Sequence, residues 1–227
     1  MTTTTTRPIA PNPSCTVHGT RTGGLRRRYF SRLWQIMDAP VDEQIAIAKD
    51  EVFRDVGGAV VEVGAGHGSN FVRYPTGTKV LAFEPNSYMK TRLAEAASSA
   101  DIELDHRMED LREARLESDS VPTVVSVLTL CSVADPAGLI TEIHRVLQPG
   151  GQFIFVEHIA EASKTRRLRA QRIVRPLWSA LFDGCDPAAP TDELIAGCGF
   201  SDIHARTENL GPSLDLTNRT HWGVATK

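Results

Sequence analysis

The sequence predicts an α/β fold, in which a doubly wound, Rossmann-like sheet of seven mainly parallel strands carries helices on both faces. Two observations lead to this prediction. Short β-branched runs alternate with helical stretches from residue 59 to the C-terminus, a pattern typical of βαβ units. In addition, the apolar run at residues 59–63 leads directly into a glycine-rich turn, as the first strand of a nucleotide-binding sheet does.

Composition divides the chain into three parts. Residues 1–24 contain a run of five threonines, three prolines and few apolar side chains, so we expect a flexible N-terminal tail. Residues 25–56 are expected to form N-terminal helices, at about 26–37 and 42–53. The first of them has apolar residues at helical spacing and could cover a pocket as a lid. Residues 57–227 are expected to form the main domain.

The main domain should alternate strands with helices. Pro176 is expected to separate two helices, because proline cannot continue the helical hydrogen bonding. Strands are expected at residues 59–63, 79–83, 102–106, 121–128, 152–156, 203–207 and 221–226, and helices at residues 70–73, 87–98, 136–147, 162–174, 176–182 and 191–198.

Charge and cysteine content exclude several classes of protein. The 25 Lys and Arg against 28 Asp and Glu give a net charge of -3, so nucleic acid is a disfavoured partner. The cysteines form no C-x-x-C pair and show no metal-ligand spacing, so we expect neither a disulfide scaffold nor a metal site. The sequence contains no run of about 18 apolar residues, so a membrane span is not predicted. A cytoplasmic location is expected. The oligomeric state has no signal in the sequence.

The turn after the first predicted strand is the most informative segment. It reads EVGAGHGSN over residues 62–70, and glycines let the backbone approach a ligand closely. A dinucleotide fingerprint would need a third glycine where Ser69 stands, so the spacing favours a nucleoside without a pyrophosphate. Glu62 suits an ammonium better than a phosphate. S-adenosylmethionine (SAM) carries an ammonium, a ribose and a cationic sulfonium.

A second carboxylate supports a nucleoside site. Glu84 follows Gly64 by 20 residues, at the end of the second predicted strand, where a carboxylate binds the ribose hydroxyls in nucleotide-binding folds. A turn that binds nothing would leave Glu84 unexplained. A nicotinamide-dependent oxidoreductase remains a competing interpretation, although the glycine spacing speaks against it.

Together these motifs resemble the class I SAM-dependent methyltransferases over about residues 60–227. Residues 62–68 are similar to that family's first motif, FEPN at residues 83–86 to its ribose-binding motif, MEDL at 108–111 to its adenine-side segment, and LQPGG at 147–151 to the turn before its fifth strand. The resemblance implies the class I methyltransferase fold and SAM as cofactor. It also implies cofactor contacts by Glu62, Gly64, Ala65, Gly66, Gly68, Asn70, Glu84, Pro85, Met108, Glu109 and Leu128.

Three further segments resemble the microsomal alkyl-thiol S-methyltransferases: LCSV at residues 130–133, VEH at 156–158 and LFDGC at 181–185. The resemblance implies methyl transfer to the thiol of a small, apolar molecule, with Asp183 and His158 as candidate catalytic residues. Oxygen or nitrogen acceptors are the alternative, and a protein that binds SAM without transferring its methyl group is another. We interpret Cys131 and Cys185 as small buried hydrophobic residues, and rank Asp183 above Cys185 as a functional residue.

Overall fold

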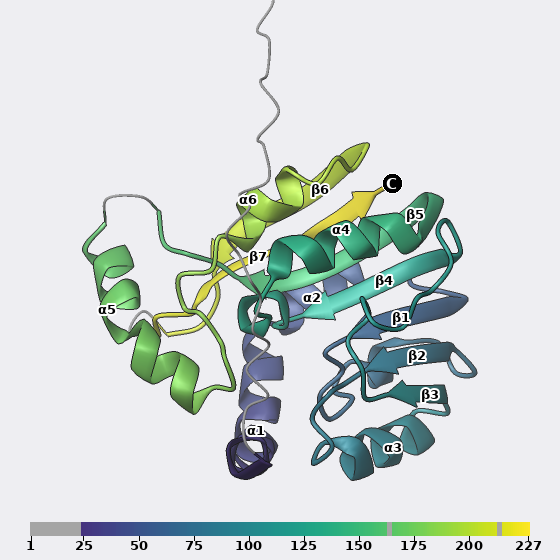
Figure 1. Cartoon of the computed structure of the whole chain (residues 1–227), viewed down its shortest axis with the longest axis horizontal. Coiled ribbons are helices and arrows are strands. Elements are labelled where there is room, and N and C mark those ends of the chain that lie inside the picture. Colours follow the sequence, from purple (N-terminus) through teal and green to yellow (C-terminus); the bar gives the residue numbers. More distant parts are fainter. Residues whose placement is uncertain (1–23, 163–164, 213–214) are drawn as a thin grey trace, which may run out of the picture.

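The structure, a computed structural model, describes residues 24–162, 165–212 and 215–227. Its centre is a seven-stranded sheet with the order β3-β2-β1-β4-β5-β7-β6 (Figure 1). β7 runs antiparallel to β5 and β6, whereas the other strand pairs are parallel. This arrangement confirms the predicted fold class. The strands are β1 (Ala59–Val63), β2 (Lys79–Phe83), β3 (Glu103–Arg107), β4 (Val121–Val127), β5 (Leu147–His158), β6 (Asp202–Asn209) and β7 (Arg219–Thr226).

Helices cover both faces of the sheet. One apolar core joins α2 and α3 to one face, and a second joins α4 and α6 to the other. The central strands are therefore buried on both sides, which explains their continuous apolar runs. The helices are α1 (Gly24–Gln44), α2 (Ala46–Val52), α3 (Lys90–Ser99), α4 (Pro136–Val146), α5 (Arg166–Leu181) and α6 (Thr191–Ala196), with short 3-10 helices η1 (Phe71–Arg73) and η2 (Leu130–Ser132).

Two prolines lie inside helices that the sequence predicts to be interrupted. α1 continues through Pro40 to Gln44, and α5 continues through Pro176, so the predicted break at Pro176 is wrong. Proline removes one backbone hydrogen bond, and here the carbonyls left free belong to the exposed residues Ile36 and Arg172. Water can satisfy these carbonyls, so the helices need not end.

The helix that follows the glycine turn is short. In dinucleotide-binding folds, a longer helix follows such a turn. Only the three-residue η1 comes after the turn, so a long helix does not direct its positive end at the site. The predicted tail lies outside the described residues except for Gly24, which begins α1. Among the helices of the described ranges, none combines the length and the apolar character needed to cross a bilayer.

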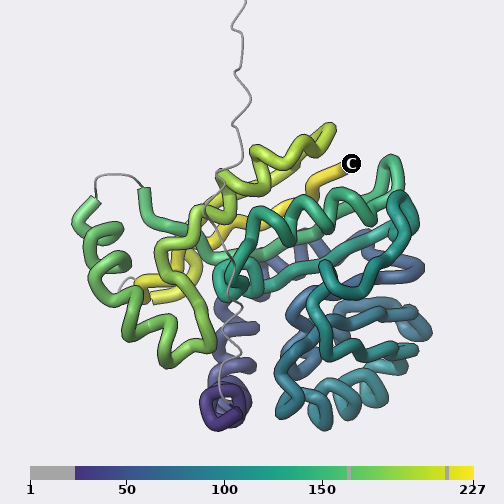
Figure 2. Tube along the Cα trace, in the orientation of Figure 1, coloured from purple at the N-terminus to yellow at the C-terminus, as the bar shows by residue number. Residues whose placement is uncertain are grey.

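The chain order places a binding site at the carboxyl ends of β1 and β4. From β3 the chain crosses over β2 and β1 to form β4, so β1 and β4 are the topological switch point at which such sheets bind ligands. Figure 2 shows α1 (purple) and α5 (green) at this same end of the sheet, although they are far apart in the sequence. Side chains of α1 and α5 both line the cavity at this end.

Candidate functional site

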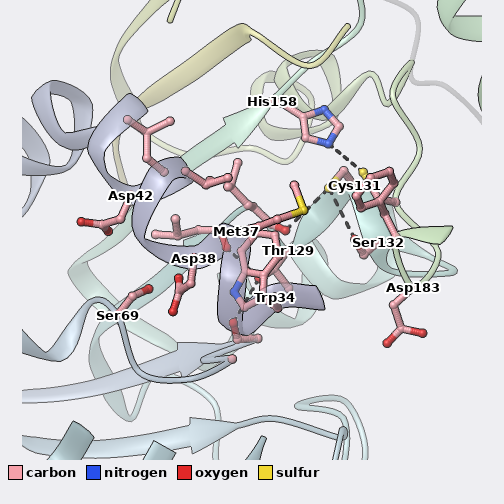
Figure 3. A pocket seen from close by; sticks show the side chains of 18 of the residues that line it. Trp34, Met37, Asp38, Asp42, Ser69, Thr129, Cys131, Ser132, His158 and Asp183 are labelled. Carbon is pink, nitrogen blue, oxygen red and sulfur yellow. Dashed lines mark hydrogen bonds between the residues drawn. The ribbon is translucent and has the colours of Figure 1, made fainter. Parts of the chain in front are cut away.

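A cavity of about 250 Å³ lies at the carboxyl ends of β1, β2, β4 and β5. It is bounded by α1, the glycine turn, the loop after β4 and the turn after α5. Its lining is mainly apolar and aromatic, with acidic groups and two cysteines among the polar residues (Figure 3). A cavity of this kind, with a few converging polar groups, is typical of a small-molecule site.

The glycine turn forms the floor of this cavity. Gly64, Gly66 and Gly68 have φ angles of +68°, +57° and +81°, which side chains rarely adopt. A Cβ atom on Gly64 would lie 2.2 Å from Oγ1 of Thr129, and one on Gly66 would face the indole nitrogen of Trp34 at 3.8 Å. Gly64, Ala65 and Gly66 line the cavity. Gly68 is not among the lining residues, and its role is packing, since a Cβ there would meet α3 and η1.

Glu84 lies at the end of β2 with its carboxylate beside the turn. The backbone N–H groups of Gly66 and Asn86 donate hydrogen bonds to its two oxygens, at 2.9 and 2.7 Å. Burial raises the pKa of Glu84 to about 7, although both backbone hydrogen bonds act in the opposite direction. Glu84 lines the cavity, so the structure places this carboxylate where the sequence predicts a ribose site.

Glu62 is not among the residues that line the cavity. Its oxygens accept hydrogen bonds from Nδ2 of Asn70 and the hydroxyl of Tyr74, both at 2.7 Å. Burial raises the pKa of Glu62, while these two hydrogen bonds lower it. Contact between Glu62 and a ligand ammonium, as the sequence predicts, does not fit this geometry. Glu62 instead positions Asn70.

Asn70 offers the acceptor that Glu62 does not. It lines the cavity, and its Oδ1 atom is buried without a hydrogen-bond partner among the described residues. A buried amide oxygen without a donor costs free energy, which an ammonium group would recover. The side chains present therefore fit SAM, because Oδ1 of Asn70 suits its ammonium and Glu84 suits its ribose hydroxyls.

Four other predicted cofactor residues divide into two groups. Pro85 and Leu128 line the cavity, whereas Met108 and Glu109 do not. Met108 is 55% exposed. The segment after β3 thus lies outside the cavity, because Leu111 in this segment packs into the second apolar core.

Helix α1 contributes two acidic side chains to the cavity, and the sequence analysis does not predict them. Asp38 and Asp42 line the cavity beside Ser69 (Figure 3). Burial raises the pKa of Asp38, opposed by Lys49 and by a hydrogen bond with Ser69. Asp38 follows Phe30 and Trp34 at intervals of four residues, so all three share one helix face. That spacing is the signal by which Asp38 could have been found.

The sulfur atoms of Cys131 and Cys185 meet the ring of His158 at the other end of the cavity. Nε2 of His158 lies 3.1 Å from Sγ of Cys185, and the indole N–H of Trp178 donates to the same sulfur at 3.3 Å. Cys131 lies close to this contact (Figure 3). One nitrogen of His158 and the sulfurs of Cys131 and Cys185 all lie within 4.8 Å of one another. The structure thus brings together three side chains of the metal-ligand type, which their spacing in the sequence does not indicate.

The pKa values of the three side chains in this cluster are shifted in different directions. The hydrogen bond with Cys131 holds the pKa of Cys185 well below its usual value against burial, and His158 lowers it further. The same hydrogen bond, together with burial, raises the pKa of Cys131. Burial would lower the pKa of His158, but Cys185 raises it above its usual value. Cys185 therefore has polar partners in His158 and Trp178, which its interpretation as a small hydrophobic residue does not include.

Glu157 holds the loop that carries Cys131. It is fully buried and accepts hydrogen bonds from the hydroxyl of Ser126 at 2.7 Å and from the backbone N–H groups of Thr129 and Leu130 at 3.1 and 3.2 Å. The carboxylate thereby satisfies the first donors of η2. The sequence analysis places Glu157 and His158 in one motif, but Glu157 holds the loop after β4 whereas His158 contacts Cys185.

Asp183 also lines the cavity. Its Oδ1 atom lies 3.7 Å from Nε of Arg26, at the start of α1. Figure 3 places Asp183 beyond Ser132 and away from His158. The two predicted catalytic side chains therefore share the cavity but approach it from different sides.

The strand order, the glycine turn and Glu84 at the cavity are those of a class I SAM-dependent methyltransferase. Residues 61–155 match the family described as methyltransferase domain. Thiol S-methyltransferase TMT1B of Homo sapiens is 30% identical over 192 residues, which are 79% of this chain and 78% of that enzyme. The chain belongs to this methyltransferase family, and its cofactor is SAM.

Solved structures share the fold. A SAM-dependent methyltransferase of Thermotoga maritima, a possible histamine N-methyltransferase, has a TM-score of 0.57 and 18% identity, covering 86% of this chain and 99% of its own. Phosphoethanolamine N-methyltransferase 2 of Haemonchus contortus, solved with SAM, has a TM-score of 0.57 and 15% identity, covering 82% of this chain and 52% of its own. At these identities the likeness concerns the fold.

Proposed function

We propose that this protein transfers the methyl group of SAM to the thiol of a small, apolar molecule. The observation that carries the proposal is that three distant segments, residues 130–133, 156–158 and 181–185, meet at one cavity with the cofactor turn. Those segments resemble thiol S-methyltransferases, and the relative with 30% identity bears that name.

The apolar part of the cavity fits such an acceptor. Phe30, Trp34 and Met37 of α1 line it together with Trp178 and Phe182. Aromatic and thioether side chains favour an apolar ligand and leave little space for water. Water exclusion matters because water competes with the acceptor for the methyl group.

Methyl transfer to a thiol needs little acid–base catalysis from the protein. SAM supplies an electrophilic methyl group on a sulfonium sulfur. Glu84 and Asn70 hold the cofactor, the aromatic residues of α1 orient the acceptor, and Asp183 accepts the thiol proton. A free thiol has a pKa of about 8.5, so a weak base in the cavity suffices. Alignment of sulfur with the methyl group supplies most of the acceleration.

A matched set of acceptors tests the proposal. The purified full chain is incubated with SAM and 2-phenylethanethiol, 2-phenylethanol or 2-phenylethylamine, which differ only in the acceptor atom, over pH 6 to 9. Mass spectrometry should find the methyl thioether, with a rate that rises toward the pKa of the thiol. Methylation of the alcohol or the amine alone would overturn the thiol assignment and leave the methyltransferase class intact. Cofactor binding without methylation of any acceptor would favour a non-transferring protein.

A further inference from the structure

Three metal-ligand side chains converge at the acceptor end of the cavity from separate parts of the fold. Cys131 lies in η2 after β4, His158 ends β5, and Cys185 lies in the turn after α5. Cys131 and His158 are buried, and all three line the cavity. Their ligand atoms lie within 4.8 Å of one another. This convergence of two sulfurs and an imidazole in one small cavity points to a shared ligand.

We propose that Cys131, His158 and Cys185 bind one Zn²⁺ ion and leave its fourth position open to the cavity, where the sulfur of the acceptor thiol binds. Two thiolates and one imidazole form a donor set that zinc takes in catalytic sites, with a substrate or water completing the tetrahedron. Soft thiolate ligands disfavour Mg²⁺ and Ca²⁺. The acceptor part of this inference rests on the proposed function.

The observed positions are close to those that zinc needs. Tetrahedral bonds of about 2.3 Å to sulfur and 2.0 Å to nitrogen place these ligand atoms about 3.5 Å apart. Nε2 of His158 and Sγ of Cys185 are 3.1 Å apart, and no pair of ligand atoms is more than 4.8 Å apart, so shifts of at most about 1.3 Å would bring all three to these separations. The buried Glu157 holds the loop that carries Cys131 by accepting hydrogen bonds from the backbone N–H groups of Thr129 and Leu130.

A neighbouring donor also suits a metal-bound thiolate. The indole N–H of Trp178 points at Sγ of Cys185, and hydrogen bonds from outside the ligand set orient and tune metal ligands. Nδ1 of His158 is buried and has no hydrogen-bond partner among the described residues. Nε2 is the ring nitrogen that contacts Sγ of Cys185, so it is the atom that would bind the ion.

The open position explains how the cavity would activate its acceptor. A thiol bound to zinc loses its proton, because the ion stabilises the thiolate. The proton passes to Asp183 and then to solvent. The electron pair of the thiolate forms the new sulfur–carbon bond, and the pair from the broken carbon–sulfur bond remains on the sulfur of S-adenosylhomocysteine.

Direct metal binding tests the site without relying on turnover. The full chain, stripped with a chelator under reducing conditions, is titrated with Zn²⁺ and analysed for metal content. We expect one tightly bound ion per chain. The variants Cys131→Ser and Cys185→Ser should bind Zn²⁺ at least about tenfold more weakly, while Cys198→Ser, in which a thiol outside the cluster is replaced, should bind it normally. Binding of S-adenosylhomocysteine by all three variants checks that they are folded.

Cobalt tests the open position. Co²⁺ in place of zinc should give visible absorption with thiolate character, and 2-phenylethanethiol should change that spectrum whereas 2-phenylethanol should not. Failure to bind an ion, equal binding by the Cys131→Ser/Cys185→Ser double variant, or a Cys131–Cys185 disulfide in the purified protein would overturn the inference. Thiol methylation by metal-free protein would overturn it as well, and would leave the proposed function standing. A cobalt spectrum that responds to thiol in a protein that methylates no thiol would instead support the site and count against the proposed function.

Discussion

Glu84 is the residue whose protonation should control cofactor binding. Burial raises its pKa to about 7, so near pH 6 the carboxyl is mostly protonated. Ribose hydroxyls donate hydrogen bonds, and the ionised carboxylate is the better acceptor. Binding therefore favours ionised Glu84 and should lower its pKa. We expect the affinity for S-adenosylhomocysteine, measured by calorimetry, to be about tenfold weaker at pH 6 than at pH 8.

The variant Glu84→Gln is the matched control for this pH effect. It keeps the shape of the side chain but cannot ionise, so its affinity should be independent of pH in this range. At pH 8 it should bind more weakly than the parent chain by about 1–3 kcal/mol. A pH dependence that persists in Glu84→Gln would assign the titration to another group.

Asp183 makes a prediction about turnover rather than affinity. Its Oδ1 atom faces Nε of Arg26 at 3.7 Å and makes no hydrogen bond within the described residues, so this oxygen has no hydrogen bond that a substrate would have to displace. Asp183→Asn should lower kcat for a thiol by roughly tenfold or more, while the affinity for S-adenosylhomocysteine should change less than about twofold. Equal losses in both quantities would show that Asp183 serves mainly to hold α1 through Arg26.

At the scale of elements, the glycine turn depends on backbone angles and on space. Gly64→Ala would force a side chain into a φ of +68° and against Thr129. We expect a loss of about 2–4 kcal/mol in the free energy of unfolding, since strain and overpacking each cost about 1–3 kcal/mol. Gly57→Ala is the control, because nothing lies within 4 Å of its Cβ position. Urea denaturation of both variants checks this, and equal stability would contradict it.

The α1 helix forms a wall of the cavity, and whether it moves as a lid remains a prediction. Trp34 faces Gly66, so Trp34→Ala should weaken cofactor binding by about 1–2 kcal/mol through lost apolar contact. Ile36→Ala on the same helix, where the side chain is 76% exposed, should leave the affinity unchanged. Calorimetry with S-adenosylhomocysteine measures both, and equal affinities would remove Trp34 from the cofactor site.

Deletion separates α1 from the segment before it. Removal of residues 1–20 should be tolerated, because their composition offers no core residues. Removal of residues 1–37 takes away Phe30, Trp34 and Met37 and should impair both cofactor and acceptor binding. Full activity of the longer deletion would show that α1 is dispensable.

At the scale of the whole molecule, the cofactor should stabilise the fold, because the cavity proposed to hold it is lined by residues that follow β1, β2 and β4. S-adenosylhomocysteine at about 100 times its Kd adds about 2.7 kcal/mol, which for a chain of this size raises Tm by about 5–10 °C. NADH should cause no shift, because the turn lacks the third glycine of dinucleotide sites. Differential scanning fluorimetry measures both, and a larger shift with NADH would reject the cofactor assignment.

The sequence by itself determined the sheet, the glycine turn and the position of Glu84 at the cofactor end of the site. Strand positions follow from short apolar runs, and the turn at Gly64 and Gly66 follows from backbone angles that glycine adopts readily. Glu84 follows from its distance along the chain. All of these signals are apolar runs, residue types or spacings along the chain, so they are present before the chain folds.

Only the tertiary structure decided the acceptor end. Cys185 lies 27 residues beyond His158 in the sequence, and no spacing rule links it to His158 or Cys131. Their meeting depends on how α5 and its following turn pack across the ends of β4 and β5. Packing likewise turned Glu62 away from the cavity and brought Asp38 into it. Such contacts depend on long-range burial and on competing hydrogen bonds, which local periodicity does not record.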